Sequence, residues 1–230
     1  MNKSSEIYDH KLNEIEHYKR FPVMKPYIGK NYGRTNNSKI MLIAESHYFP
    51  PTSTINKDTD KWYDSTQKDL EKEEIRWINT REIVGGEWKP AGHMIHRELN
   101  LRMSEFMDTS KFRAMTNIVF MNRFQRPADE TGDSIKHFCK PIDCQIGAQT
   151  IQAVIDIVEP NLIIFVSKFS WDVLRWKLPK KDNGMKIEYV CHPGTGGRYW
   201  HNKKYQHGLK KFKKLIGTEL EKKRTNKVLW

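Results

Sequence analysis

Four short apolar runs constrain the fold more than any other feature of this 230-residue chain. Each run is bounded by turn-forming or polar residues, which is typical of a strand that is buried on both faces. The runs occupy residues 39–44, 117–121, 162–166 and 186–191. Helical patterns separate them, and strands that alternate with helices favour a parallel sheet with helices on both faces. We therefore expect an α/β fold, a three-layer α/β/α sandwich around a central, mainly parallel, four-stranded sheet.

The periodicity of the apolar residues places the expected helices between and around these strands. They are expected at residues 3–19, 66–80, 92–108 and 143–158, from about residue 169, and at 205–223. The last of them is a strongly basic C-terminal helix. Residues 51–90 are mostly polar and are expected to form an insertion on the core fold. A chain of this length suits one domain, so we expect residues 1–230 to form a single unit.

The charge balance favours a polyanionic partner. Lys and Arg number 40 against 28 Asp and Glu, which gives a formal net charge of +12. Neutralised phosphates release counterions, so such a chain is suited to DNA, although a basic surface can also serve solubility alone. The N-terminus lacks the apolar core of a signal peptide, and no apolar run approaches the roughly 20 residues that span a membrane. We expect a cytoplasmic monomer that does not bind membranes.

Metal and cofactor sites are not expected. One metal site could be imagined from three cysteines and a histidine: Cys139, Cys144, Cys191 and His192. Cysteines without CxxC spacing are more typical of free or buried thiols, and a disulfide framework is equally unexpected. His93 and His96 share a helix face, but no further ligand accompanies them.

Polar residues follow all four predicted strands. In open parallel sheets ligands bind outside the carboxyl ends of the strands, so these residues should meet at one rim. The residues that follow the strands in chain order are Glu45, Ser46, His47 and Tyr48, then Asn122, then Ser167 and Lys168, and finally His192. The rim thus receives a carboxylate, an amide, a cation and an imidazole.

This set of groups suits the excision of a nucleobase. Asn122 offers a donor and an acceptor for a base edge, with Asn117 as a rival for that role. His192 can stabilise the negative charge that develops on a departing base. Glu45 can position water or steady the positive charge on the sugar, unless it only caps a loop. Tyr48 or Phe124 can offer a stacking face, although Tyr48 could equally pack in the core.

Several further residues are candidates for contacts with the base or with DNA. His47 is either a second pocket residue or a loop histidine. Lys168 is either a phosphate contact or a cation at the start of a helix. The glycine-rich segment 194–197 would let the backbone approach phosphates closely, with Arg198 and Trp200 able to press on a duplex. Arg126 is a further DNA-binding candidate, and the lysines of the C-terminal helix either contact phosphate or form a solvated face.

The motifs at the strand ends resemble those of the uracil-DNA glycosylase superfamily. They read Ala-Glu-Ser-His-Tyr at 44–48, Phe-Met-Asn at 120–122 and His-Pro-Gly at 192–194. Segment 160–168 is also similar, so the resemblance spans about residues 39–200. It implies a monofunctional DNA glycosylase that removes uracil or another modified base. By this resemblance Glu45 would activate or position water, Tyr48 would exclude bulkier bases, Asn122 would read the base and His192 would stabilise the departing anion.

The chain departs from the family pattern at three positions. Ala44 replaces a glycine, Ser46 stands at the usual aspartate position, and Gly194 replaces a serine. The four cysteines of the iron–sulfur branches are missing, so no cluster is expected. Two other functions stay open: a non-catalytic, nucleic-acid-binding member of the same fold that senses modified DNA, and a nucleotide or nucleoside hydrolase. DNA repair and defence against foreign DNA are both compatible settings.

Overall fold

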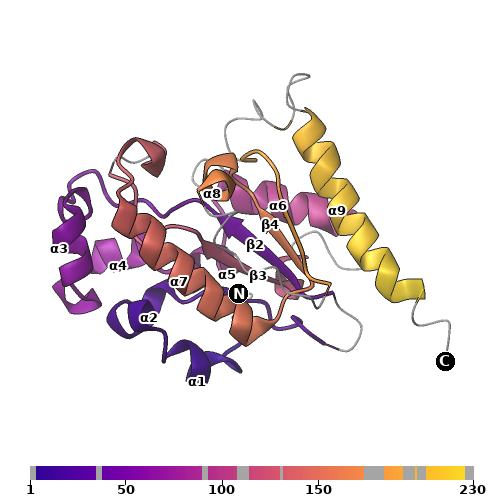
Figure 1. The fold of residues 1–230 in the computed structure, drawn as a ribbon, viewed down its shortest axis with the longest axis horizontal. Helices are drawn as coiled ribbons and strands as arrows, with labels where there is room; N and C mark the ends of the chain where they lie inside the picture. Colours follow the sequence, from indigo (N-terminus) through magenta and orange to yellow (C-terminus); the bar gives the residue numbers. More distant parts are fainter. Residues whose placement is uncertain are drawn as a thin grey trace.

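A mixed β-sheet forms the centre of the molecule (Figure 1). The computed structural model describes residues 4–34, 38–89, 93–107, 114–129, 132–173, 184–193, 200 and 206–225. Within them the sheet has five strands, in the order β1-β3-β2-β4-β5. Their bounds are β1 Tyr27–Ile28, β2 Ile40–Ala44, β3 Ile118–Asn122, β4 Leu162–Phe165 and β5 Lys186–Tyr189. Strands β2 to β5 are parallel, so the predicted α/β fold with a mainly parallel sheet is confirmed.

The predicted strand count of four is corrected by β1. This strand pairs antiparallel with β3, Tyr27 opposite Phe120 and Ile28 opposite Val119. A strand of two residues is too short to produce an alternating pattern, so sequence periodicity could not reveal it. Gly29 follows, and a Cβ at this position would lie 2.2 Å from the carbonyl oxygen of Thr116. Only glycine lets the edge segment approach β3 this closely.

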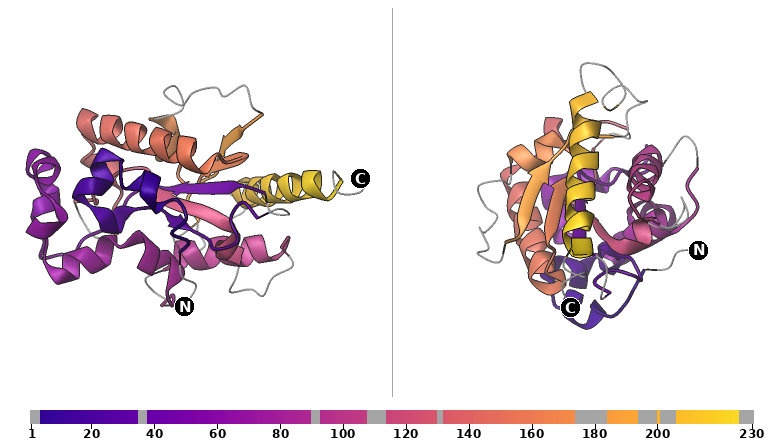
Figure 2. Two further views of the ribbon diagram at one scale, coloured as in Figure 1. Left: turned by 90° about the horizontal axis from the view of Figure 1, so that it is seen from below. Right: turned by 90° about the vertical axis from the view of Figure 1, so that its right-hand side faces the viewer.

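Helices cover both faces of the sheet (Figure 2). On one face lie α7 (Pro141–Val158), α1 (Asp9–Leu12) and α2 (Glu16–Arg20), and the opposite face carries α6 (Met94–Ser104) and α9 (Gln206–Thr225). The central strand β2 is buried on both sides: Met41 and Ile43 pack into the first layer, while Leu42 and Ala44 pack into the second. This explains why β2 reads as an uninterrupted apolar run.

Two predicted helices are broken in the structure. In place of one helix over 66–80, the chain forms a 3-10 turn at Gln67–Asp69, then α4 (Lys72–Ile78) and the start of α5 (Thr80–Gly85); a further helix, α3 (Thr59–Asp64), precedes them. Asn79 starts α5, because its side chain accepts a hydrogen bond of 3.2 Å from the amide of Glu82. The predicted helix over 3–19 is likewise divided into α1 and α2, because Ile15 adopts an extended backbone. The other predicted helices are present, including α8 (Lys168–Asp172).

A buried ion pair ties α3 and α7 to the loop after β3. The Arg126 guanidinium donates to both carboxylate oxygens of Asp143, at 2.9 and 3.0 Å. The hydroxyl of Tyr63, in α3, donates to the same carboxylate at 2.8 Å. Arg126 and Asp143 are both 0% exposed. Buried charges are tolerated only when they are paired in this way, so the network fixes the loop that follows β3.

Candidate functional site

The carboxyl ends of β2, β3 and β4 bring the predicted rim residues to one edge of the sheet. Ala44 pairs with Asn122 in the β2–β3 ladder, and the amide of Phe124 donates to the carbonyl oxygen of Glu45 at 2.9 Å. The chain leaves β2 toward β3 on one side and leaves β4 toward β5 on the other. The boundary between β2 and β4 is therefore the topological switch point, where open α/β sheets bind ligands.

Glu45 lies at this switch point and is held by two serines. Ser167, at the end of β4, donates a hydrogen bond of 2.7 Å to Oε2 of Glu45. Ser134 donates a short hydrogen bond to Oε1. A carboxylate has about four lone-pair positions, so both oxygens can still accept a further donor. The arrangement fixes the orientation of the carboxylate and leaves it able to hold a water molecule.

His192, three residues after the end of β5, lies close enough to Glu45 to interact with its charge. Burial lowers the pKa of His192 below its usual value of 6.5, and the nearby Glu45 carboxylate opposes that shift. The two groups are therefore within electrostatic range. A lowered pKa leaves the imidazole neutral at pH 7, and a neutral imidazole has one ring nitrogen that donates a hydrogen bond and one that accepts.

Tyr48 lies near the Glu45 carboxylate and is partly exposed. Its side chain is 36% exposed, and with Ile7 it is one of the two large exposed apolar side chains in the described part of the chain. Burial and then the nearby carboxylates of Glu45 and Asp133 raise the pKa of Tyr48. An accessible aromatic ring next to a carboxylate can stack on a flat ligand.

Asn122 and its rival Asn117 have different environments. Asn117 immediately precedes β3, at its amino end, and its amide nitrogen donates to the carbonyl oxygen of Ala114 at 3.3 Å. Asn122 ends β3 at the rim and is 8% exposed, and its side-chain amide makes no hydrogen bond with the described part of the chain. The amide of Asn122 is therefore the one that could pair with a ligand.

His47 and Phe124, two predicted base contacts, face other parts of the molecule. The Nε2 atom of His47 hydrogen-bonds with the hydroxyl of Thr80 at 3.0 Å, and burial lowers the pKa of His47 to about 4. The Phe124 ring is fully buried and stacks on Phe169, with the ring centroids 5.5 Å apart. Both side chains hold the structure together, and neither presents a free surface to a base.

The predicted DNA contacts differ in their exposure to solvent. Trp200 and Arg126 are fully buried, so neither is a surface contact and these two predictions are corrected. The indole nitrogen of Trp200 donates to the carbonyl oxygen of Cys191 at 2.7 Å, and so anchors the segment that carries His192. Lys168 is exposed at the start of α8 and pairs with Asp172. Arg198 and the glycines at 194–197 lie outside the described residues.

The basic helix α9 is partly neutralised by the protein itself. Lys211 lies 2.7 Å from a carboxylate oxygen of Glu188, and Lys213 lies 2.6 Å from Glu105. Lys210 and Lys214 are exposed. Among the α9 side chains that the structure describes, these two are the lysines best placed to meet a polyanion.

Sequence reasoning missed two residues at the rim, Ser134 and His96, and placed Ser167 there without giving it a role. Ser134 and Ser167 hold Glu45, and Ser134 gave no signal because only the folding of the 132–140 loop brings it to β2. His96, on α6, was considered only as a metal ligand. Its ring lies edge-on to Phe120, 4.9 Å between centroids, on the face of β3 that also carries Asn122. Its Nδ1 atom is buried without a hydrogen-bond partner, and burial lowers its pKa to about 3.

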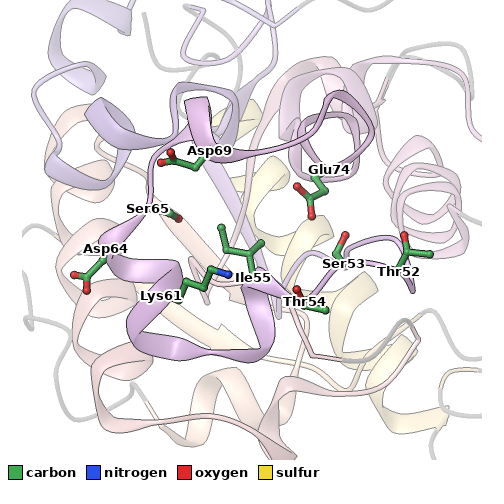
Figure 3. Close-up of a pocket in the computed structure, with 9 residues that line it drawn as sticks. All are labelled: Thr52, Ser53, Thr54, Ile55, Lys61, Asp64, Ser65, Asp69 and Glu74. Carbon is green, nitrogen blue, oxygen red and sulfur yellow. The ribbon is translucent and has the colours of Figure 1, made fainter.

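The hollow drawn in Figure 3 lies away from these residues. It has a volume of about 590 Å³ and is formed by α3, α4 and the loops around them. Its lining consists of Thr52, Ser53, Thr54, Ile55, Lys61, Asp64, Ser65, Asp69 and Glu74. Three carboxylates against one lysine disfavour a phosphate there, and none of the rim residues takes part.

The described residues contain no cluster of three or more His, Cys, Asp or Glu side chains arranged to hold a metal ion. None of the helices in this part of the chain combines the length and apolar character needed to cross a bilayer. A comparison with models of known protein families found no match, and a comparison with curated proteins found no significant relative. The function is therefore argued from the site.

Proposed function

We propose that this chain is a DNA base glycosylase of the uracil-DNA glycosylase superfamily, which hydrolyses the N-glycosidic bond of a base flipped out of DNA. One observation carries the proposal. The Glu45 carboxylate, held by two serines, lies within electrostatic range of a neutral His192 at the switch point of the sheet. Glycosidic cleavage develops positive charge on the sugar and negative charge on the base. It is therefore assisted by a carboxylate near the sugar and by a hydrogen-bond donor near the base.

In the proposed reaction Glu45 acts on the sugar side of the bond. Its remaining lone pairs accept a hydrogen bond from water, and its negative charge stabilises the cationic sugar. His192 acts on the base side. A neutral imidazole keeps one N–H group, and this group donates a hydrogen bond to the base anion as the glycosidic bond breaks.

Recognition of the base falls to Asn122 and Tyr48. The buried amide of Asn122 makes no hydrogen bond with the described part of the chain, so it is available to the edge of a flipped base. Tyr48 supplies the exposed ring on which that base, or its neighbour, stacks.

The order of the motifs and the charge support the assignment to DNA. The segments that resemble the superfamily follow β2, β3 and β5, at one edge of a mainly parallel sheet. The formal charge of +12 and the exposed Lys168, Lys210 and Lys214 favour binding to the phosphate backbone of single- or double-stranded DNA.

A base-release assay tests this proposal. Oligonucleotides that carry uracil, hypoxanthine or a bulky modified pyrimidine are incubated with the protein in the presence of a chelator, and abasic sites are counted. We expect release from at least one of them, reduced about 10²- to 10⁴-fold by Glu45→Gln and by His192→Ala. Two exposed residues of the same types give matched controls, Glu16→Gln and His10→Ala, which should retain full activity.

The other outcomes separate the alternatives. Salt-dependent binding without release from any substrate would support a non-catalytic protein that senses modified DNA. Hydrolysis of free nucleotides with little affinity for DNA would support a nucleotide hydrolase. Full activity in both rim variants would refute the roles given to Glu45 and His192.

A further inference from the structure

Two thiols that the proposed reaction does not use lie together at the N-terminal end of α7. The sulfur atoms of Cys139 and Cys144 are 3.6 Å apart. Cys139 ends the loop that carries Ser134, and Cys144 lies at the end of the first turn of α7. Both side chains are partly exposed, so a small solute can reach them.

A buried cation lies beside the thiols. Arg123 is 0% exposed, and its Nη2 donates to the carbonyl oxygen of Cys144 at 2.9 Å. Its Nε and Nη1 atoms are buried without a hydrogen-bond partner. Gly147 makes room for the guanidinium, because a Cβ there would lie 2.0 Å from Nη1. The Asp143 carboxylate is within electrostatic range but is hydrogen-bonded to Arg126, so this buried guanidinium favours a further anion nearby.

The two sulfur atoms differ in their surroundings. Burial, with further contributions from the neighbouring Cys144 and Asp143, raises the pKa of Cys139 to about 12, so this thiol keeps its proton. Cys144 lies at the end of the first turn of α7, and the Arg123 guanidinium is within electrostatic range of its sulfur. Cys144 is therefore the sulfur suited to attack an electrophile.

We propose that Cys139 and Cys144 are an oxidation site that closes to a disulfide on reaction with hydrogen peroxide. The Cys144 thiolate attacks one peroxide oxygen, the O–O bond breaks, and the departing hydroxide takes up a proton as water. The sulfur of Cys139 then attacks the resulting sulfenic acid, the S–O bond breaks and a second water leaves. The two thiols lose two electrons and two protons, and peroxide is reduced to two molecules of water.

The closure requires only a small movement. The sulfur atoms approach from 3.6 Å to about 2.05 Å, and the 132–140 loop lies outside the sheet. A dithiol reductant reverses the reaction by thiol–disulfide exchange. The inference does not depend on the reaction proposed for the rim, because it concerns only the oxidation chemistry of this pair.

Alkylation and intact mass measurement test the proposal. The reduced protein is treated with a small excess of hydrogen peroxide, denatured and alkylated with N-ethylmaleimide. The chain has three cysteines, so we expect three alkyl groups before oxidation and one afterwards, with three restored by dithiothreitol. Cys191→Ala is the matched control, and it should lose both of its remaining reactive thiols. Three alkyl groups on the oxidised wild-type protein would overturn the proposal.

Two conservative variants test the pairing and the attacking sulfur. Cys139→Ser should accumulate sulfenic acid at Cys144, trapped by dimedone, at close to the wild-type rate of peroxide consumption. Cys144→Ser should consume peroxide at least tenfold more slowly. Loss of two thiols in Cys144→Ser would reveal a different pairing and overturn the site, and rapid sulfenic acid formation at Cys139 would overturn the order of attack. Near-UV circular dichroism of each reduced variant checks that it folds.

Discussion

Ser167 donates a hydrogen bond of 2.7 Å to the carboxylate of Glu45, although the two residues are separated by 122 positions in the chain. Ser134 binds the other carboxylate oxygen from a third segment. The carboxylate therefore has one fixed orientation before any substrate is present. Such preorganisation matters in catalysis, because a group that must first be oriented contributes less to the transition state.

Removing either serine should slow base release without weakening DNA binding. For Ser167→Ala and Ser134→Ala we expect kcat to fall about tenfold, which corresponds to ~1.4 kcal/mol, while KM for the oligonucleotide stays nearly constant. Ser167→Thr keeps the hydroxyl and should recover most of the loss. Steady-state kinetics measures both constants. Ser104→Ala, which removes a hydroxyl bonded within α6, serves as the control. An equal loss in this control would mean that the serines act only through stability.

Tyr48 should contribute to affinity through its ring rather than its hydroxyl. We expect Tyr48→Ala to weaken binding of a single-stranded oligonucleotide by about 1–3 kcal/mol. Tyr48→Phe should retain most of the wild-type affinity, because stacking needs only the aromatic face. Fluorescence anisotropy at fixed salt gives the Kd. Ile7→Ala removes the other large exposed apolar side chain and should have no effect. A loss in Tyr48→Phe equal to that in Tyr48→Ala would argue against stacking.

The buried histidines should make stability depend on pH. Burial lowers the pKa of His47 to about 4 and those of His17 and His96 to about 3. In the unfolded chain these histidines have a pKa of about 6.5. As the pH is lowered from about 6.5 to about 4, they bind protons in the unfolded chain but not in the folded one, so the free energy of unfolding decreases.

The contribution of His47 to this slope can be isolated. His47→Gln keeps a hydrogen-bonding side chain beside Thr80 but cannot titrate, so it should reduce the slope by up to about 1.4 kcal/mol per pH unit. Urea unfolding at several pH values between 4.5 and 7.5 measures the free energy of unfolding. His10→Gln changes an exposed histidine and should leave the slope unaltered. An unchanged slope in His47→Gln would show that His47 titrates normally.

The Arg126–Asp143 pair should be far more important for stability than a surface pair. Asp143→Ala leaves a buried guanidinium with fewer partners and a Tyr63 hydroxyl without its acceptor, so we expect a loss of about 3–5 kcal/mol. Glu14→Ala breaks a pair with Lys19 that is 3.7 Å long and solvent-exposed, and should cost under about 1 kcal/mol. Urea unfolding compares the two. A loss near that of the surface pair would contradict the structural role of the network.

The sequence by itself determined the four parallel strands and the chain positions at which polar groups leave them. A strand as short as 40–44 can be recognised from its own residues, because a strand that is buried on both faces is apolar at every position. The same reasoning placed Glu45, Asn122 and His192 at one rim. The sequence could not show β1, which is two residues long, or the breaks that divide the helices at Ile15 and Asn79.

Only the tertiary structure decided which of the neighbouring polar and aromatic side chains face the rim. His47 turns to Thr80, and Arg126, Phe124 and Trp200 are buried, whereas Ser134 reaches Glu45 from a distant loop. The physical reason is that a side chain's direction depends on the partners that compete for it, and those partners come from segments far apart in the chain. Periodicity reports whether a residue is buried, but a buried polar group takes the donor or acceptor that the fold supplies.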